Sequence, residues 1–316
     1  MSPFLLQVAR HYSGASGLED YCFVFPNRRS GQFFADYLQK ELAAHDRETG
    51  ACRPHLMPSV TSIDGLVTRL TDTVCATDIE MIFALYEAYC QAMGSQAQEF
   101  DKFIYWAQLI LGDFNDIDKS LADAHAIYSN LDDLHSLSSN YLTADVKEKV
   151  ERIFGESLFT AFFDTSNEAN LWQQRHDKKL KDKDKTPTDS EKDIVKQEFV
   201  SLWNALGRIY DLFHQVLDGK GLVSPGRQLR LAAESPSTRL PYSQFVFVGF
   251  GVLSAAEVKL FDYFKQEGNA DFWWDNAGIP DLLKKASHDP GALLIESYCQ
   301  RFGRSEEHTS ELQSRE

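Results

Sequence analysis

Residues 21–26 read YCFVFP, a short apolar run that is rich in strand-forming residues and ends at a proline. Such a run predicts a buried β-strand. The polar residues Asn27, Arg28 and Arg29 follow directly, and apolar side chains then recur at helical spacing over residues 33–42. A strand, a polar loop and a helix in this order predict the first unit of an α/β sheet.

Three further runs extend the predicted sheet. Residues 56–61 (LMPSVT) are a weaker strand candidate because Pro58 interrupts them, and Ser62 is placed to cap the helix that follows. Residues 244–250 (QFVFVGF) give the strongest strand pattern in the chain, and residues 270–274 (ADFWW) give another. Strands that alternate with helices predict a parallel sheet with helices on its faces.

The chain between these units is predicted to be helical. Capping boxes at Thr77 and Glu80 and at Ser254 and Glu257 mark two helix starts. Apolar residues with a period near 3.6 predict helices over residues 79–93, 100–114, 146–162 and 195–217.

These patterns predict an α/β domain built from residues 1–76 and 221–303, with an all-helical insertion at residues 77–220. Residues 176–192 are polar and of mixed charge, which predicts a mobile loop between two helices of the insertion. An alternative interpretation is that the lysines of residues 176–192 form a nucleic-acid-binding patch. It is less favoured because the aspartates between these lysines cancel much of their positive charge.

Composition limits the function classes. The 32 lysines and arginines stand against 47 aspartates and glutamates, a net charge of −15, so a uniformly basic nucleic-acid-coating surface is excluded while a local basic patch is not. No apolar run is long enough to predict a transmembrane helix. The five cysteines are scattered and never spaced CxxC, which predicts a reducing, cytoplasmic environment without disulfides or a zinc site.

Several catalytic patterns are missing. No GxxxxGK[ST] phosphate loop is present, and we interpret Gly14 and Gly17 as a helix end and a turn. Gly249 and Phe250 follow the strongest strand, where an ATPase of this layout carries the acids that hold Mg²⁺. No GxSxG or HExxH pattern occurs, so we predict no catalytic residue and no metal ligand in these residues. Four histidines are expected to have surface or packing roles: His11, His125, His135 and His214.

An acidic cluster in GDFNDIDKSLAD gives a further site hypothesis. Asp113, Asp116, Asp118 and Asp123 offer oxygen ligands to a divalent cation, but their spacing matches no calcium loop. The favoured interpretation is a polar helix face together with caps near a helix start at Ser120.

The best functional candidates follow two predicted strands. Asn27, Arg28 and Arg29 come after the first strand, at the edge where open parallel sheets bind ligands, and arginines there can grip phosphate. Thr61 and Ser62 hold the corresponding position after the next strand, where hydroxyls and a helix N-terminus make either a phosphate site or an N-cap. The alternative for the arginines is an exposed basic loop without a ligand.

Four stretches in this order resemble one known family: FPNRR (25–29), VTSIDGLVTRL (60–70), FDKFIYWAQLILGDFNDIDK (100–119) and FVFVGFGVLSAAEVKLF (245–261). They are similar to the N-terminal region of AddB-type helicase-nuclease subunits, in particular the Bacteroidetes branch labelled PD-(D/E)XK nuclease family proteins. The resemblance covers residues 3–303, and its strength is in the order and spacing of motifs that are individually weak.

The resemblance implies a RecA-like, superfamily 1 helicase-like domain that lacks the phosphate loop and carries a helical insertion. It also implies a partner helicase-nuclease subunit and a role in processing DNA ends for double-strand break repair and recombination. Asn27, Arg28, Arg29, Thr61 and Ser62 match the positions of motifs on the single-stranded-DNA face of active relatives. No cofactor is implied for these residues, and Mg²⁺ is expected only for a nuclease domain beyond residue 303.

The last residues, 304–316, have no apolar periodicity and resemble a sequencing adapter translated in one frame. We therefore expect these residues to be a read-through tail and the natural protein to continue past Gly303. Two other functions stay open on the sequence: a protein-interaction scaffold that does not touch DNA, and a nucleotide-hydrolysing enzyme with a non-standard site.

Overall fold

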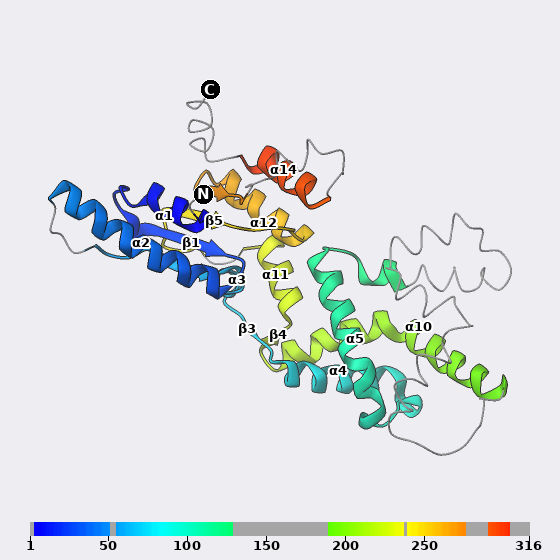
Figure 1. Cartoon of the computed structure of the whole chain (residues 1–316). Coiled ribbons are helices and arrows are strands. Elements are labelled where there is room, and N and C mark those ends of the chain that lie inside the picture. Colours follow the sequence, from blue (N-terminus) through cyan, green and yellow to red (C-terminus); the bar gives the residue numbers. More distant parts are fainter. Residues whose placement is uncertain (1–2, 51–54, 129–188, 237–238, 276–289, 304–316) are drawn as a thin grey trace, which may run out of the picture. The chain divides into compact units, whose positions relative to one another are not determined.

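The computed structural model describes residues 3–50, 55–128, 189–236, 239–275 and 290–303. They belong to two compact units, one made of residues 1–90, 98–122 and 212–316, and the other of residues 91–97 and 123–211. The first unit contains a parallel sheet with helices on both faces (Figure 1), so the predicted α/β class is confirmed. The predicted tail at residues 304–316 lies outside the described residues.

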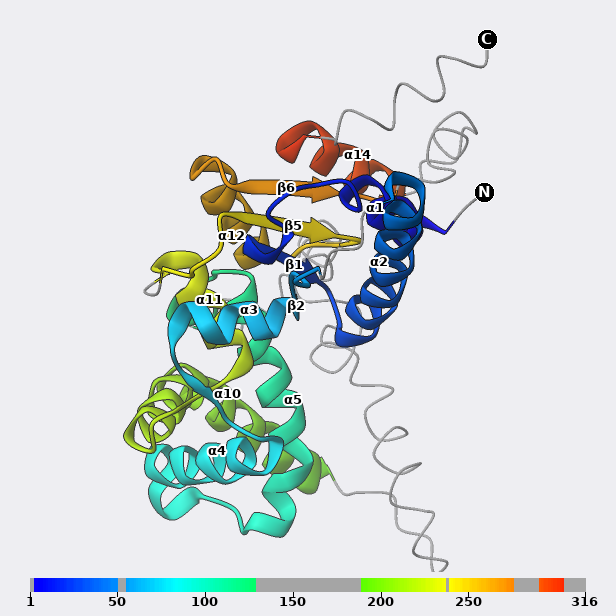
Figure 2. The ribbon, with the colours of Figure 1, turned by 90° about the vertical axis from the view of Figure 1, so that its left-hand side faces the viewer.

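The sheet has four strands in the order β2-β1-β5-β6, and every neighbouring pair is parallel (Figure 2). The strands are β1 (Tyr21–Phe25), β2 (Ser59–Ser62), β5 (Gln244–Val248) and β6 (Ala270–Trp273). All four were predicted, but β2 begins only after Pro58, because proline has no N–H to donate to a neighbouring strand.

The side chains of these strands alternate between two apolar cores. Phe23 and Phe25 of β1 point into a core beneath α1 (Phe4–Tyr12) and α2 (Arg28–Thr49). Cys22 and Val24 point into the opposite core. Helices cover both faces of the sheet, which is why its strands read as continuous apolar runs rather than as alternating ones.

The opposite core is covered by four helices: α3 (Ile63–Thr71), α11 (Pro225–Glu234), α12 (Ala255–Gln266) and α14 (Pro290–Phe302). Helix α12 begins at the predicted capping box, in which the Ser254 hydroxyl accepts from the Glu257 amide and the Glu257 carboxylate accepts from the Ser254 amide. Phe247 of β5 stacks on Phe272 of β6 at 5.2 Å between ring centroids, and both rings are fully or nearly fully buried.

The region predicted to be an insertion supplies three long helices: α4 (Asp78–Met93), α5 (Phe100–Lys119) and α10 (Asp189–Gly219). Helix α10 begins before the predicted end of the loop at residues 176–192, so residues 189–192 are helical. The rest of that loop and the predicted helix at residues 146–162 lie outside the described residues.

Two short strands were not predicted. β3 (Val74–Cys75) pairs in parallel with β4 (Leu222–Val223), and the Ala76 amide donates to the Val223 carbonyl at 2.8 Å. Two residues are too few to give a periodic signal. This pairing holds the two ends of the predicted insertion side by side, so that the chain leaves and re-enters the α/β part at one place.

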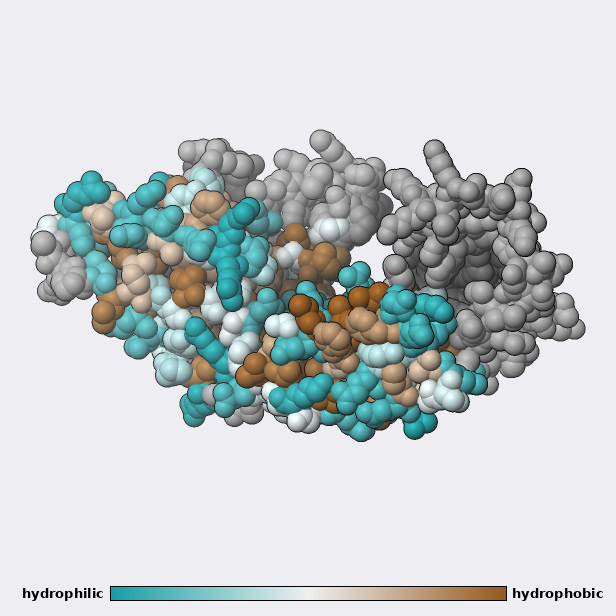
Figure 3. Space-filling view, turned by 90° about the horizontal axis from the view of Figure 1, so that it is seen from below, coloured by the Kyte–Doolittle hydropathy of each residue, from teal (hydrophilic) through white to brown (hydrophobic). Residues whose placement is uncertain are grey.

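An apolar surface lies on α4 and α5. Ile79 and Phe83 of α4 are 67% and 55% exposed, Phe83 stacks on Phe100 at 5.4 Å between centroids, and Ile104 follows Phe100 by one helical turn. Figure 3 shows hydrophobic side chains gathered on the face seen from below. Among the described residues, no helix combines the length and the apolar character needed to cross a membrane.

Candidate nucleic-acid interface

The carboxyl ends of all four strands of the sheet lie at one edge, because the strands are parallel. Phe25, the last residue of β1, pairs in register with Ser62, the last residue of β2. Asn27 therefore begins α2 next to the place where Ser62 begins α3. The structure brings the two predicted motifs to neighbouring positions on the edge where open α/β sheets bind their ligands.

Asn27 is the N-cap of α2. Its side-chain Oδ1 accepts from the Ser30 amide at 2.9 Å and from the Ser30 hydroxyl at 3.1 Å. Gly31 in the next turn allows α2 to lie against the sheet, since a Cβ atom there would stand 2.9 Å from Cγ1 of Val60 and 3.3 Å from a ring carbon of Phe25. The start of α2 is thus fixed in position by its cap and by this close approach.

Arg28 and Arg29 were expected in a loop, but they form the first turn of α2. The correction follows from the Asn27 cap, which starts the helix immediately after the strand. Both side chains are exposed, and within the described part of the chain neither guanidinium forms an ion pair with a carboxylate. The first turn of α2 contains no acidic residue.

This charge placement opposes the helix macrodipole. The N-terminus of a helix carries a partial positive charge. Each cation placed there therefore destabilises the helix by about 0.3–1 kcal/mol, whereas an acidic residue there would stabilise it. The Asn27 side chain already accepts from the Ser30 amide, and the two guanidinium groups beside this helix end attract an anion. The start of α2 is therefore a place where phosphate relieves an unfavourable charge arrangement.

Thr61 and Ser62 are engaged differently. The Ser62 side chain is buried, and its Oγ accepts from the Gly65 amide at 3.3 Å, so the N-cap alternative describes its role. The Thr61 hydroxyl donates to the Ser62 carbonyl at 3.3 Å and is only half-buried. A Cβ on Gly65 would stand 2.4 Å from that hydroxyl oxygen, so glycine is needed here for α3 to begin against β2.

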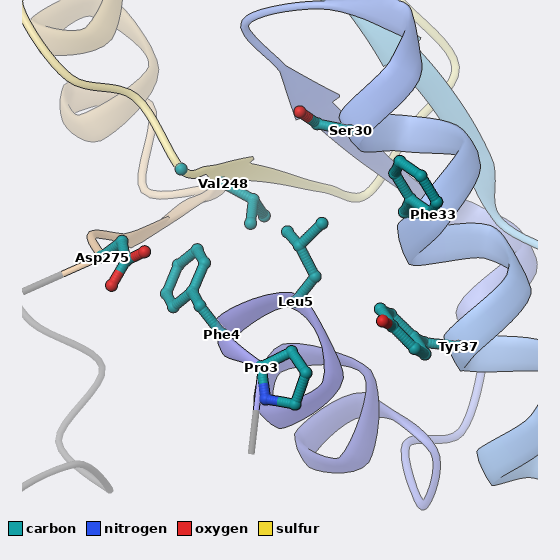
Figure 4. Close-up of a pocket in the computed structure, with 9 residues that line it drawn as sticks. Pro3, Phe4, Leu5, Ser30, Phe33, Tyr37, Val248 and Asp275 are labelled. Atoms are coloured by element: carbon teal, nitrogen blue, oxygen red, sulfur yellow. The ribbon is translucent and has the colours of Figure 1, made fainter. Parts of the chain in front are cut away.

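A cavity of about 380 Å³ opens beside the start of α2 (Figure 4). Phe33 and Tyr37 of α2 face Phe4 and Leu5 of α1 across it, and Val248 ends β5 at one side. The remaining lining residues are Pro3, Ser30, Gly249 and Asp275. The helical spacing of apolar residues included both Phe33 and its buried neighbour Phe34, and it did not distinguish the two.

The end of β5 carries no acidic pair. Gly249 follows the strand with φ of +72°, a left-handed conformation that favours glycine, and its amide donates to the Trp273 carbonyl at 2.9 Å. Glu257, which follows it along the chain, is bound in the capping box of α12. Nowhere in the described ranges do three or more potential metal-ligating side chains of His, Cys, Asp or Glu gather.

Asp271 of β6 has a structural role. Its carboxylate accepts from the Tyr12 hydroxyl at 2.5 Å and from the Trp273 indole N–H at 3.2 Å, which ties α1 to the edge strand. Burial, followed by the nearby negative charge of Asp271, raises the pKa of Tyr12 far above its usual range. Tyr12 therefore stays a neutral donor to Asp271 at all working pH values.

The aspartates of the acidic cluster do not converge. Asp118 is buried and lies 3.5 Å from His214 and 3.7 Å from Arg230. Asp123 caps the next helical turn by accepting from the amides of residues 125 and 126, while Ser120 ends α5. The predicted helix start at Ser120 is wrong, because the polar run that suggested a start is the end of α5.

Asp113 gives a pH-dependent prediction. Burial, and then the charge of Asp116, raises the pKa of Asp113 to about 6. A raised carboxyl pKa means that ionisation destabilises the fold, so the cost is absent below about pH 4, grows between pH 4 and 6, and is complete above about pH 6. We expect Asp113→Asn to raise the free energy of unfolding by about 1 kcal/mol at pH 7.5, after allowing for partial solvent exposure. Urea unfolding at pH 7.5 and pH 4 checks this, and a gain of equal size at both values would contradict it.

No protein-family model matches the chain, and no curated protein matches it.

Proposed function

We propose that this chain is the N-terminal, inactivated-helicase module of a DNA end-processing helicase-nuclease, and that it binds single-stranded DNA at the carboxyl edge of its sheet. The observation that carries the proposal is the pair Arg28 and Arg29, exposed in the first turn of α2 where no acidic residue offsets them. Asn27 orients this turn, and Thr61 and Ser62 form the adjoining strand end.

Two features of the fold support the proposal that this module is RecA-like. The sheet is parallel and covered on both faces, and the helices α4, α5 and α10 lie between β3 and β4 in the sequence. The sequence has neither a phosphate-loop lysine nor an acidic pair after β5, so the module binds DNA without a motor of its own. In this proposal a partner helicase subunit supplies the motor, and a Mg²⁺-dependent PD-(D/E)XK domain outside these residues cuts the DNA.

The arginine pair provides the test. We expect Arg28→Gln/Arg29→Gln to weaken binding of a single-stranded oligonucleotide about 25-fold at 0.1 M salt. Each phosphate contact on a single strand releases about 0.7 of a bound counterion. Losing one contact therefore lowers the affinity at 0.1 M salt by a factor of about 10 to the power 0.7. Fluorescence anisotropy with a labelled oligonucleotide measures the change.

The control removes the same charge from the other end of the same helix. Lys40 and Arg47 are also exposed on α2, in its later turns. Lys40→Gln/Arg47→Gln is expected to bind the oligonucleotide within about two-fold of the unchanged protein at 0.1 M salt, because these side chains lie away from the proposed site. Equal losses in the two double variants would mean that net charge rather than this site binds DNA.

The apolar surface on α4 and α5 favours a second candidate function, a protein-interaction scaffold. Ile79 and Phe83 are more than half exposed on adjacent turns of α4, and such contiguous apolar surface is typical of protein interfaces. The scaffold reading is preferred if the protein binds a purified helicase subunit, if Phe83→Asp abolishes that binding, and if DNA binding is undetectable.

A further inference from the structure

The cavity beside α2 has aromatic side chains in its lining. Its two walls carry aromatic side chains, Phe33 and Tyr37 on one side and Phe4 on the other (Figure 4). The ring of Phe4 lies against the turn after β5, since a Cβ on Gly249 would stand 3.5 Å from its Cε1 atom. The volume of about 380 Å³ falls at the small end of ligand-binding pockets.

Phe33 occupies an unusual position for so large an apolar side chain. Its neighbours Phe34 and Leu38 are fully buried beneath the sheet, whereas Phe33 is 54% exposed at the mouth of the cavity. Arg29 lies four residues before Phe33, and Tyr37 lies four residues after it. A cation and two aromatic rings therefore follow one another along one side of α2.

We propose that this cavity takes one unstacked base of single-stranded DNA, held against Phe33 and Tyr37, while the sugar-phosphate backbone passes Arg28 and Arg29. This inference rests on the proposed function and assigns the base-binding part of the same site. Aromatic side chains that bind bases by stacking, beside basic groups that bind phosphates, are the usual means of holding a single strand.

The charge distribution decides the orientation of the strand. Asp275 lines the cavity and its carboxylate repels phosphate, whereas the positive charge lies at the start of α2. A cavity that holds a carboxylate beside three aromatic rings disfavours the phosphates of a free nucleotide and accepts a neutral base. The strand therefore inserts a base and keeps its phosphates at the helix N-terminus.

The test compares an ordinary oligonucleotide with one of the same length that lacks bases. We expect the unchanged full chain to bind the abasic strand about ten-fold more weakly, and Phe33→Ala to remove that difference by weakening only the base-bearing strand. Phe33→Leu, which keeps the apolar contacts but removes the ring, is expected to behave like Phe33→Ala. The salt dependence of binding stays unchanged in both variants, because neither alters charge.

Leu109→Ala is the matched control, since Leu109 is 52% exposed on α5, a helix that does not line the cavity. It is expected to leave both affinities unchanged. Equal binding of the two strands by the unchanged protein, or an undiminished preference for bases in Phe33→Leu, would overturn the base pocket while leaving phosphate binding by the arginines intact. No binding of either strand would instead overturn the proposed function.

Discussion

Replacing Asp118 by alanine is expected to lower the free energy of unfolding by about 1–3 kcal/mol, because it removes a buried carboxylate that lies beside polar side chains of two other helices. Asp118 is 1% exposed and lies on α5, where its carboxylate is 3.5 Å from Nε2 of His214 on α10 and 3.7 Å from the guanidinium of Arg230 on α11. This carboxylate therefore lies close to side chains from two other helices.

The loss is large because the partners stay in place. Arg230 is held by the Ala122 carbonyl at 2.8 Å and by Glu234 at 3.2 Å, so it cannot turn to water freely when Asp118 is removed. His214 is almost completely buried and would lose the carboxylate beside it.

Chemical denaturation of Asp118→Ala measures this effect. Asp116→Ala is the control, since Asp116 is an exposed aspartate on the same helix and is expected to change the free energy of unfolding by less than about 0.5 kcal/mol. A loss below about 1 kcal/mol in Asp118→Ala would contradict the assignment of Asp118 as the shared partner.

Gly226→Ala is expected to destabilise the protein by about 1–3 kcal/mol, since it inserts a methyl group where two helices touch. A Cβ atom on Gly226 of α11 would stand 2.8 Å from the backbone carbonyl oxygen of Asn115 on α5 and 2.9 Å from the side-chain oxygen of the same residue. A backbone oxygen cannot rotate away, so the two helices must separate.

Gly112 gives a control on the facing helix. It lies within α5, and a Cβ atom there meets nothing within 4 Å. Gly112→Ala is therefore expected to stabilise the protein by about 0.5–1 kcal/mol, because alanine favours the helix and nothing opposes it. Thermal unfolding of the two variants should give shifts of opposite sign, and a neutral Gly226→Ala would show that the helices are not in close contact.

The sheet was predictable because its signals are local and strong. Residues 21–25 and 245–248 are continuous apolar runs that end at a proline and at a glycine, and a capping box marked the helix that follows β5. The bounds of β2 were predicted less well. The predicted run was residues 56–61, whereas β2 begins at Ser59, directly after Pro58. The pair β3 and β4 went unpredicted because each strand has only two residues and exists through its partner.

The candidate site was only partly predictable. The order of strand and polar residues located Asn27, Arg28 and Arg29, but it placed the arginines in a loop rather than in the first turn of a helix. The role of Phe33 depends on which apolar positions of α2 face the sheet, and helical spacing alone does not separate it from Phe34. The contact of Asp118 with His214 joins residues far apart in the sequence, so it required the packing of three helices.

The central claim, that the start of α2 binds the phosphates of a single strand, is tested most directly by the salt dependence of DNA affinity. The logarithm of the association constant falls with the logarithm of salt concentration, with a slope of about −0.7 for each neutralised phosphate of a single strand. Arg28→Gln/Arg29→Gln is predicted to make that slope about 1.4 less steep than in the unchanged protein, while Lys40→Gln/Arg47→Gln leaves it as it is. An identical slope in the unchanged protein and in the Arg28 and Arg29 variant would contradict the account.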